Sequence, residues 1–92
     1  MIIRILGEGQ RELDDAATAE LQKLDAQLET AVEGNDEQAF TAAHGALLDL
    51  VRQRGTELPS DSLEASDVII PHEGATLDEV RQLLTDEGLI PG

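Results

Sequence analysis

The side chains that could do chemistry in this chain begin with two histidines, His44 and His72. A zinc site built on one helix needs a second histidine or a carboxylate three or four residues away, and His44 has neither. His72 follows Pro71, where an ordinary loop position explains it. The chain contains no cysteine, which excludes a Cys-based zinc site and a thiol nucleophile. We therefore predict no metal site.

Nucleophilic and acid–base catalysis have no clear residue set either. The serines Ser60, Ser62 and Ser66 all fall in one turn-rich stretch, without the glycine-flanked elbow that a catalytic serine needs. Acidic pairs at 36–37 and 78–79 fall in the first turns of predicted helices, where the helix dipole explains them. We expect no catalytic residues and a protein that is not an enzyme.

The glycines on either side of Glu8 could form a phosphate-binding loop or a tight turn. A P-loop needs a lysine and a Ser or Thr after its last glycine, and none follows here. A dinucleotide-binding loop would need a third glycine at position 12, which is Glu12. Phe40 is the only aromatic residue, which argues against a deep cofactor pocket. We predict a turn and no cofactor.

The pattern of elements that must position these residues is β-β-α-α-β-α, an α+β fold in one domain over residues 1–92. Residues 1–6 are β-branched and apolar and predict a strand, which the glycine turn connects to a short polar edge strand at 10–13. Residues 67–71 predict a buried strand that pairs with the first. Residues 55–66 are predicted to be loop, which leaves a small sheet of two or three strands.

Two amphipathic helices are predicted between the strands. Apolar residues spaced by three and four positions run through 15–33 and again through 36–54. Gly34 separates the two helices, and Asn35 is predicted to cap the second. The pair predicts an antiparallel helical hairpin whose inward-facing leucines are Leu21, Leu24, Leu28, Leu47 and Leu50.

The C-terminal part of the chain predicts a third helix and an apolar tail. Thr76 and Glu79 form a capping box, and the helix is expected to end at Gly88. The tail contains Leu89 and Ile90. Exposed apolar residues are costly, so we expect these two to pack on the body of the protein or on a partner.

The net charge of −14 narrows the classes of partner. Such a chain repels nucleic-acid phosphates and anionic lipid headgroups, so we expect neither nucleic-acid binding nor direct membrane binding. No segment approaches the roughly 20 apolar residues of a membrane span, and residues 1–6 do not form a signal peptide. We expect a cytoplasmic protein, with the charge serving either solubility or attraction of a basic partner.

Both ends of the chain resemble the PspA-associated proteins, the PspAA family. The resemblance rests on the opening MIIRILGEGQ, on SDVIIP at 66–71, on TLDEVR at 76–81 and on EGLIPG at 87–92. It implies a non-catalytic component of the phage-shock-type envelope stress response. In that system PspA is a long coiled-coil protein that assembles on stressed membranes.

The resemblance implies an adaptor or regulator that binds a PspA-like coiled-coil protein, with a homodimer as a further alternative. We expect the acidic outer positions of the first helix and the apolar tail to contact the partner: Glu20, Asp25, Glu29, Glu33, Leu89 and Ile90. A different class of function is an acidic mimic that occupies a basic nucleic-acid-binding protein. A basic DNA-binding protein encoded beside this one would favour the mimic.

Overall fold

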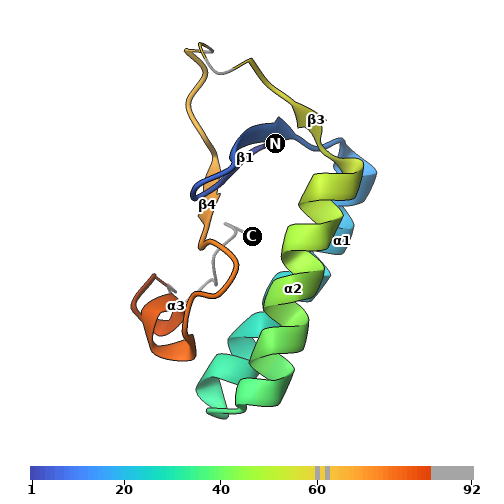
Figure 1. Ribbon diagram of the computed structural model, residues 1–92. Helices are drawn as coiled ribbons and strands as arrows, with labels where there is room; N and C mark the ends of the chain where they lie inside the picture. The colour runs from blue at the N-terminus through green and yellow to red at the C-terminus, as the bar shows by residue number, and fades with distance from the viewer. Residues whose placement is uncertain (60, 62, 84–92) are drawn as a thin grey trace.

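The computed structural model describes residues 1–59, 61 and 63–83, and its elements follow the predicted order with one addition (Figure 1). The α+β class and the helical hairpin are confirmed. The elements are β1 (Ile2–Ile5), β2 (Gly9–Glu12), α1 (Asp15–Glu33), α2 (Glu37–Arg54), β3 (Thr56–Glu57), β4 (Val68–Ile70) and α3 (Leu77–Leu83).

The described strands form one mixed sheet in the order β3-β2-β1-β4. Strand β1 pairs antiparallel with β2 and parallel with β4, as Ile3 faces Arg11 on one side and Val68 on the other. The predicted pairing of the two apolar strands is therefore confirmed. Strand β1 lies between β2 and β4. It therefore connects the N-terminal β-hairpin to the strand that comes late in the described chain.

Strand β3 corrects the prediction that residues 55–66 are all loop. Thr56 and Glu57 pair with β2, so the sheet has four strands and β2 lies inside it rather than at its edge. Both residues of β3 are exposed, so no apolar alternation marks the strand in the sequence. The chain turns tightly from α2 into β3 at Gly55. A Cβ at this position would lie 2.5 Å from the Val51 carbonyl oxygen and 2.8 Å from Arg11 Cβ.

The connection between α1 and α2 also differs from the prediction. Asn35 does not cap α2 but adopts a left-handed conformation, with φ of 52°. The N-cap is Asp36, whose Oδ1 accepts a hydrogen bond from the backbone N–H of Ala39 at 3.1 Å. Asn35 and Asp36 both tolerate either role, so the sequence alone places the cap only to within one residue.

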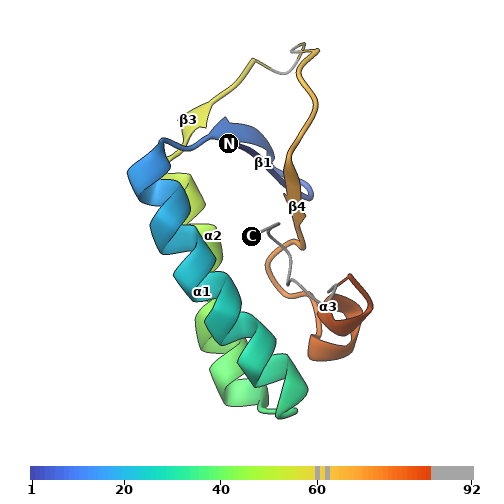
Figure 2. The same cartoon turned by 180° about the vertical axis from the view of Figure 1, so that it is seen from behind.

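The hairpin packs along one face of the sheet and forms one long side of the molecule (Figures 1 and 2). Leu21, Leu28 and Leu47 are fully buried, as predicted, whereas Leu24 and Leu50 are only partly buried. The buried stripe of α1 shifts from position 24 toward position 25, because the helix must face the sheet as well as α2. The other fully or nearly fully buried side chains include Ile3, Ile5, Leu13, Leu48, Val51, Ile70 and Val80.

A pair of arginines fastens the outer elements to the hairpin. Arg81 of α3 donates to Asn35 Oδ1 at 2.8 Å and to the Val32 carbonyl oxygen at 3.2 Å, a carbonyl at the end of α1 that also accepts from the Asn35 N–H at 3.1 Å. Arg52 of α2 binds the β1–β2 turn through both oxygens of Glu8, with an Nε–Oε1 distance of 3.0 Å. The two contacts hold opposite ends of the hairpin to the rest of the fold.

The Glu8 carboxylate is stabilised in its charged form by this contact. The hydrogen bond from Arg52 holds the pKa of Glu8 below its ordinary value of 4.5, and the same bond raises the pKa of Arg52. Arg11 lies 3.6 Å from the same carboxylate. The phosphate-loop alternative is not supported, because Glu8 places a negative charge in the turn. Gly7 and Gly9 instead adopt the positive φ angles, 88° and 95°, that the turn requires.

The packing of the hairpin predicts that Leu47→Ala lowers the free energy of unfolding by about 2–5 kcal/mol, since it leaves a cavity in the core. Leu24→Ala should cost clearly less, because Leu24 is only partly buried. The fully exposed Leu63 provides the control, and Leu63→Ala should leave stability unchanged. Urea unfolding followed by circular dichroism measures all three. Equal losses for Leu24 and Leu47 would contradict the described packing.

The Glu8–Arg52 contact predicts a pH-dependent loss of stability. Because the pKa of Glu8 is lower in the folded protein than in the unfolded chain, its contribution is present above pH 4.5 and is lost as the pH falls through the folded value. Glu8→Gln should therefore destabilise the protein at pH 7 and have little effect well below pH 4. Glu12→Gln removes the same charge from β2 without breaking an ion pair within the described chain. A pH-independent difference between wild type and Glu8→Gln would refute the interpretation.

Candidate protein-binding surface

The acidic residues predicted to bind a partner have different environments in the structure. Glu33 is exposed and Glu29 is half-buried. Glu20 is exposed but forms an ion pair with Arg54 of α2, with an Oε2–Nη1 distance of 3.1 Å. This pair links the two helices at the end of the hairpin near the sheet. Glu29 and Glu33 thus remain the best candidates of the set for attracting a partner.

Asp25 is not an outer position, contrary to the prediction. Its side chain is buried, with a relative exposure of 4 % for the residue. It lies four residues after Leu21 and three before Leu28, on the stripe of α1 that faces the interior. A heptad pattern centred on Leu24 places Asp25 beside the apolar seam, and the small rotation of the helix moves it inside. Asp25 therefore cannot contact a partner in this conformation.

The apolar tail residues Leu89 and Ile90 lie outside the described residues, as does the predicted helix end at Gly88. Their assignment as partner contacts stays a prediction.

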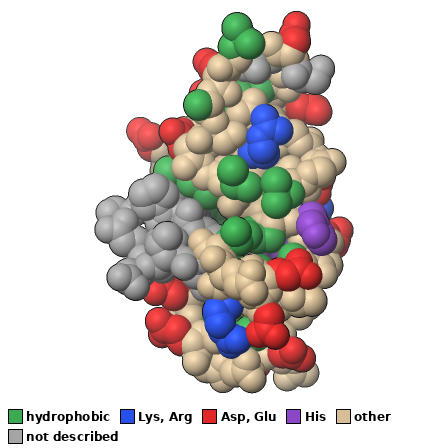
Figure 3. Space-filling view, turned by 90° about the vertical axis from the view of Figure 1, so that its left-hand side faces the viewer, with side chains coloured by type: hydrophobic (Ala, Val, Ile, Leu, Met, Phe, Trp, Pro, Cys, Tyr) green, Lys and Arg blue, Asp and Glu red, His purple; other side chains and the backbone are tan. Residues whose placement is uncertain are grey.

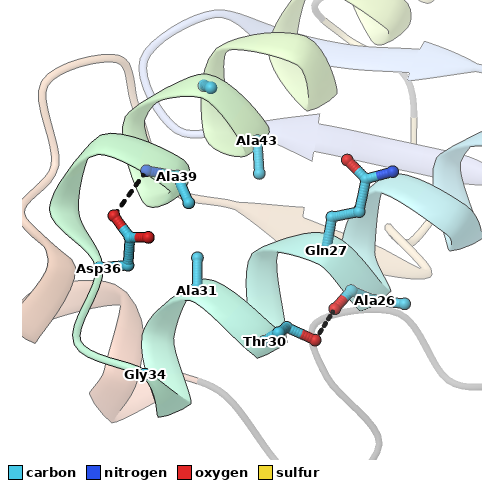
Figure 4. Close-up of a pocket in the computed structure, with 9 residues that line it drawn as sticks. Ala26, Gln27, Thr30, Ala31, Gly34, Asp36, Ala39 and Ala43 are labelled. Carbon is cyan, nitrogen blue, oxygen red and sulfur yellow. Dashed lines mark hydrogen bonds between the residues drawn. The ribbon is translucent and has the colours of Figure 1, made fainter.

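A groove runs between the two helices near the connection at Gly34 (Figure 4). Its volume is about 730 Å³. Ala31 and Ala43 are buried in its floor, whereas Ala26, Ala39 and Ala42 are exposed. The complete lining is Ala26, Gln27, Thr30, Ala31, Gly34, Asp36, Ala39, Ala42 and Ala43. We call this surface the alanine groove.

The small side chains of the alanine groove decide what it can bind. Alanine, glycine and threonine leave the two helix backbones accessible, so an approaching helix can pack closely against both. The polar groups at its margins are occupied locally: Thr30 donates to the Ala26 carbonyl oxygen at 3.0 Å, and Asp36 caps α2 (Figure 4). The arrangement offers shape and apolar contact rather than a reactive group.

Sequence reasoning missed the alanine groove, although a signal was present. Positions 39, 42, 43 and 46 of the second helix are all alanine, a spacing of three, one and three that forms its own stripe. The prediction of the hairpin rests on the seam of apolar residues and assigns no separate face to these alanines. A stripe of small residues beside a leucine seam indicates a second helix-packing face.

The histidines both have structural contacts. His44 is buried, stacks on Phe40 with ring centroids 5.5 Å apart, and has its Nε2 3.0 Å from the Pro71 carbonyl oxygen. This contact joins α2 to the segment that follows β4. His72 is exposed, with its Nδ1 2.8 Å from the Glu73 carbonyl oxygen. Among the described residues, no three side chains of the metal-binding types come together.

Within the same described part of the chain, no helix has the length and hydropathy needed to cross a membrane.

Comparison with known proteins gives one match. The family model for the PspA-associated protein, PspAA, matches residues 1–92, which is the whole chain. Searches of curated proteins and of solved structures gave no significant match. The opening residues, the SDVIIP strand and the capping box of α3 all lie within the matched range. The chain therefore belongs to the PspAA family.

Proposed function

We propose that this protein is a non-catalytic adaptor that binds a PspA-like coiled-coil protein through the alanine groove. The family description links the chain to PspA. The observation that carries the proposal is the open groove of small residues along the outside of the helical hairpin. A third helix laid into this groove would complete a bundle of the kind that coiled-coil proteins form readily.

The size of the groove residues favours a helix as the occupant. Ala26 on α1 and Ala39 and Ala42 on α2 are exposed and line the groove from both helices. A large side chain from a facing helix can enter between them and contact the backbone of both helices, which is the geometry of a knob in a hole. Leucine and isoleucine at the seam positions of a coiled coil provide such side chains.

Charge around the groove favours a partner helix with basic flanks. Asp36 lines the end of the groove, and Glu33, one turn after Thr30, is exposed on α1 near it. Glu29 lies on the flank of α1 farther from the groove and adds to the attraction only at longer range. Lys and Arg beside the apolar seam of the partner would meet these residues, and long-range attraction to the −14 chain would speed the encounter.

The same charge supports a cytoplasmic regulator that stays off anionic membranes. Attraction to PspA combined with repulsion from lipid headgroups would let this protein hold PspA subunits away from the membrane. The engagement of His44 in a buried contact with Pro71, of Asp36 in capping α2 and of Asp78 in an ion pair with Arg81 favours binding over catalysis.

Filling the alanine groove should weaken binding without unfolding the protein. The double variant Ala26→Gln with Ala42→Gln adds bulk at two exposed helical positions, where glutamine is nearly as favourable as alanine. We expect the affinity for a purified PspA-like protein to fall by at least about fivefold, since overpacking a close contact costs roughly 1–3 kcal/mol. Isothermal titration calorimetry measures the change.

Ala19→Gln is the matched control, because Ala19 is an exposed alanine of α1 outside the groove. It should bind as wild type does, and all three proteins should melt alike. No binding by wild type at tens of micromolar would remove the adaptor function. Full binding by the double variant would place the interface on another surface.

Removing two carboxylates from α1 should slow the association with the partner. Glu29→Gln with Glu33→Gln should lower the association rate constant severalfold at low salt and leave the dissociation rate nearly unchanged. Added salt should reduce the difference, because screening weakens the attraction. Biolayer interferometry at several salt concentrations gives both rates. Glu12→Gln with Glu57→Gln removes two charges from the sheet instead, and an equal effect from that pair would show that net charge alone is responsible.

A further inference from the structure

The sheet has an apolar surface that is separate from the alanine groove. Side chains alternate across β1 and β4, so Ile3, Ile5, Val68 and Ile70 face the helices. Ile69 points the other way and is 51 % exposed, and Leu6, just after β1, is 40 % exposed. Figure 3 shows hydrophobic side chains gathered in the middle of this side of the molecule, with a basic side chain directly above them and acidic side chains below and toward the rim.

The edge of the sheet at β4 is open within the described chain. Strand β4 is the last in the sheet order, and no described strand pairs with its outer side. The Ile70 carbonyl oxygen accepts a hydrogen bond from the Leu6 N–H on the inner side at 3.1 Å, so alternation turns the backbone groups of Ile70 and Val68 toward β1 and those of Ile69 away from it. An unpaired edge of this kind can accept another strand.

The two edges of the sheet differ in how well they resist such pairing. Strand β3 at the opposite edge consists of Thr56 and Glu57, which carry a charge and are followed closely by Pro59. Charge and proline are the usual means of blocking an edge. Strand β4 has the sequence Val-Ile-Ile, with no charged residue, and Pro71 follows it directly, so a proline lies close to both edges and charge is what distinguishes them. Only the β4 edge is left uncharged.

Charges at the ends of β4 indicate which segment would fit. Asp67 comes directly before the strand. Glu73 follows it with 78 % of its side chain exposed, and its Oε2 lies 3.6 Å from Arg52 Nη2, so a basic segment would share this carboxylate with Arg52. The Asp67 carboxylate accepts one hydrogen bond, from the Ile2 N–H at 2.8 Å, and has further acceptor positions. Arg4 is the basic residue that could repel such a segment, and it lies on β1. It is therefore about two strand spacings, or roughly 10 Å, from a strand added outside β4.

We propose that the β4 edge binds an extended segment of a partner protein, with a few β-branched residues flanked on both sides by lysine or arginine. The segment adds a fifth strand through backbone hydrogen bonds, and one of its side chains packs beside Ile69. Its basic flanks meet Asp67 and Glu73. This site is independent of the alanine groove and of any helix bound there.

A second copy of this chain is a poorer occupant of the same edge. Pairing β4 with itself would bring together two chains that each carry a charge of −14. The acidic residues at the ends of one β4 would face those of the other in an antiparallel pair. Like charges so placed destabilise strand pairing.

The test uses the full-length ¹⁵N-labelled protein and the peptide acetyl-KKVIVKK-amide. We expect saturable shifts of the backbone amide signals of Val68, Ile69 and Ile70. Ile69→Lys should weaken binding by roughly fivefold or more, since it places a like charge beside the incoming lysines. Leu63→Lys makes the same change of charge at a fully exposed leucine outside the strand, and should weaken binding less.

A peptide of the same sequence, N-methylated at its three central amides, separates backbone pairing from simple charge attraction. Loss of binding by this peptide, with wild-type binding retained by the parent, supports strand addition. The proposal is overturned if both peptides bind alike, if Ile69→Lys and Leu63→Lys have equal effects, or if the shifts fall outside β4. It is also overturned if the protein dimerises through β4 and the peptide does not compete.

Discussion

Strand β1 pairs on both sides, and the rest of the architecture depends on that position. Its four residues carry the register for β2 on one side and for β4 on the other. Ile3 and Ile5 are completely buried, so the same short strand also anchors the sheet to the hairpin. The Met1 amino group donates to the Leu13 carbonyl oxygen at 3.0 Å, which ties the first residue to the start of α1. Loss of β1 would remove both the sheet and the surface on which the helices pack.

The two sides of the hairpin differ in the size of their side chains. One side supplies the leucines that cover the sheet, and the other presents alanines to solvent. Large side chains toward the core and small ones toward the outside form a thin two-helix layer with room for a third helix. Glu20 links the two helices through Arg54, whereas Glu33 is exposed on α1. The proposed recognition would therefore use residues that contribute little to folding.

Much of the fold could be predicted from the sequence because its signals are local. The strand at residues 2–5, the hairpin turn, the two long helices and the Thr76 cap each follow from residues close together in the chain. Strand β3 could not be predicted, because Thr56 and Glu57 are held only by backbone pairing with β2. Asp25 lies four residues after Leu21 and three before Leu28, a spacing that places it on the buried stripe, but its charge favoured an exposed position. Of the predicted contact residues, Glu33 is exposed and Glu29 half-buried. The alanine spacing on α2 marked one wall of the alanine groove, whereas its pairing with α1 followed only from the packed helices.

The parallel pairing of β1 with β4 has a consequence for how the chain is made. Ile2 and Asp67 are hydrogen-bonded across 65 residues, whereas the contacts between α1 and α2 join neighbouring segments. On the ribosome, the N-terminal strand and the hairpin emerge first, and β1 must wait for β4 before its second side is covered. During that interval the apolar residues of β1 are partly unprotected, with only β2 and the hairpin to shield them. A high density of negative charge on the nascent chain would keep such intermediates apart from one another until translation reaches the last strand.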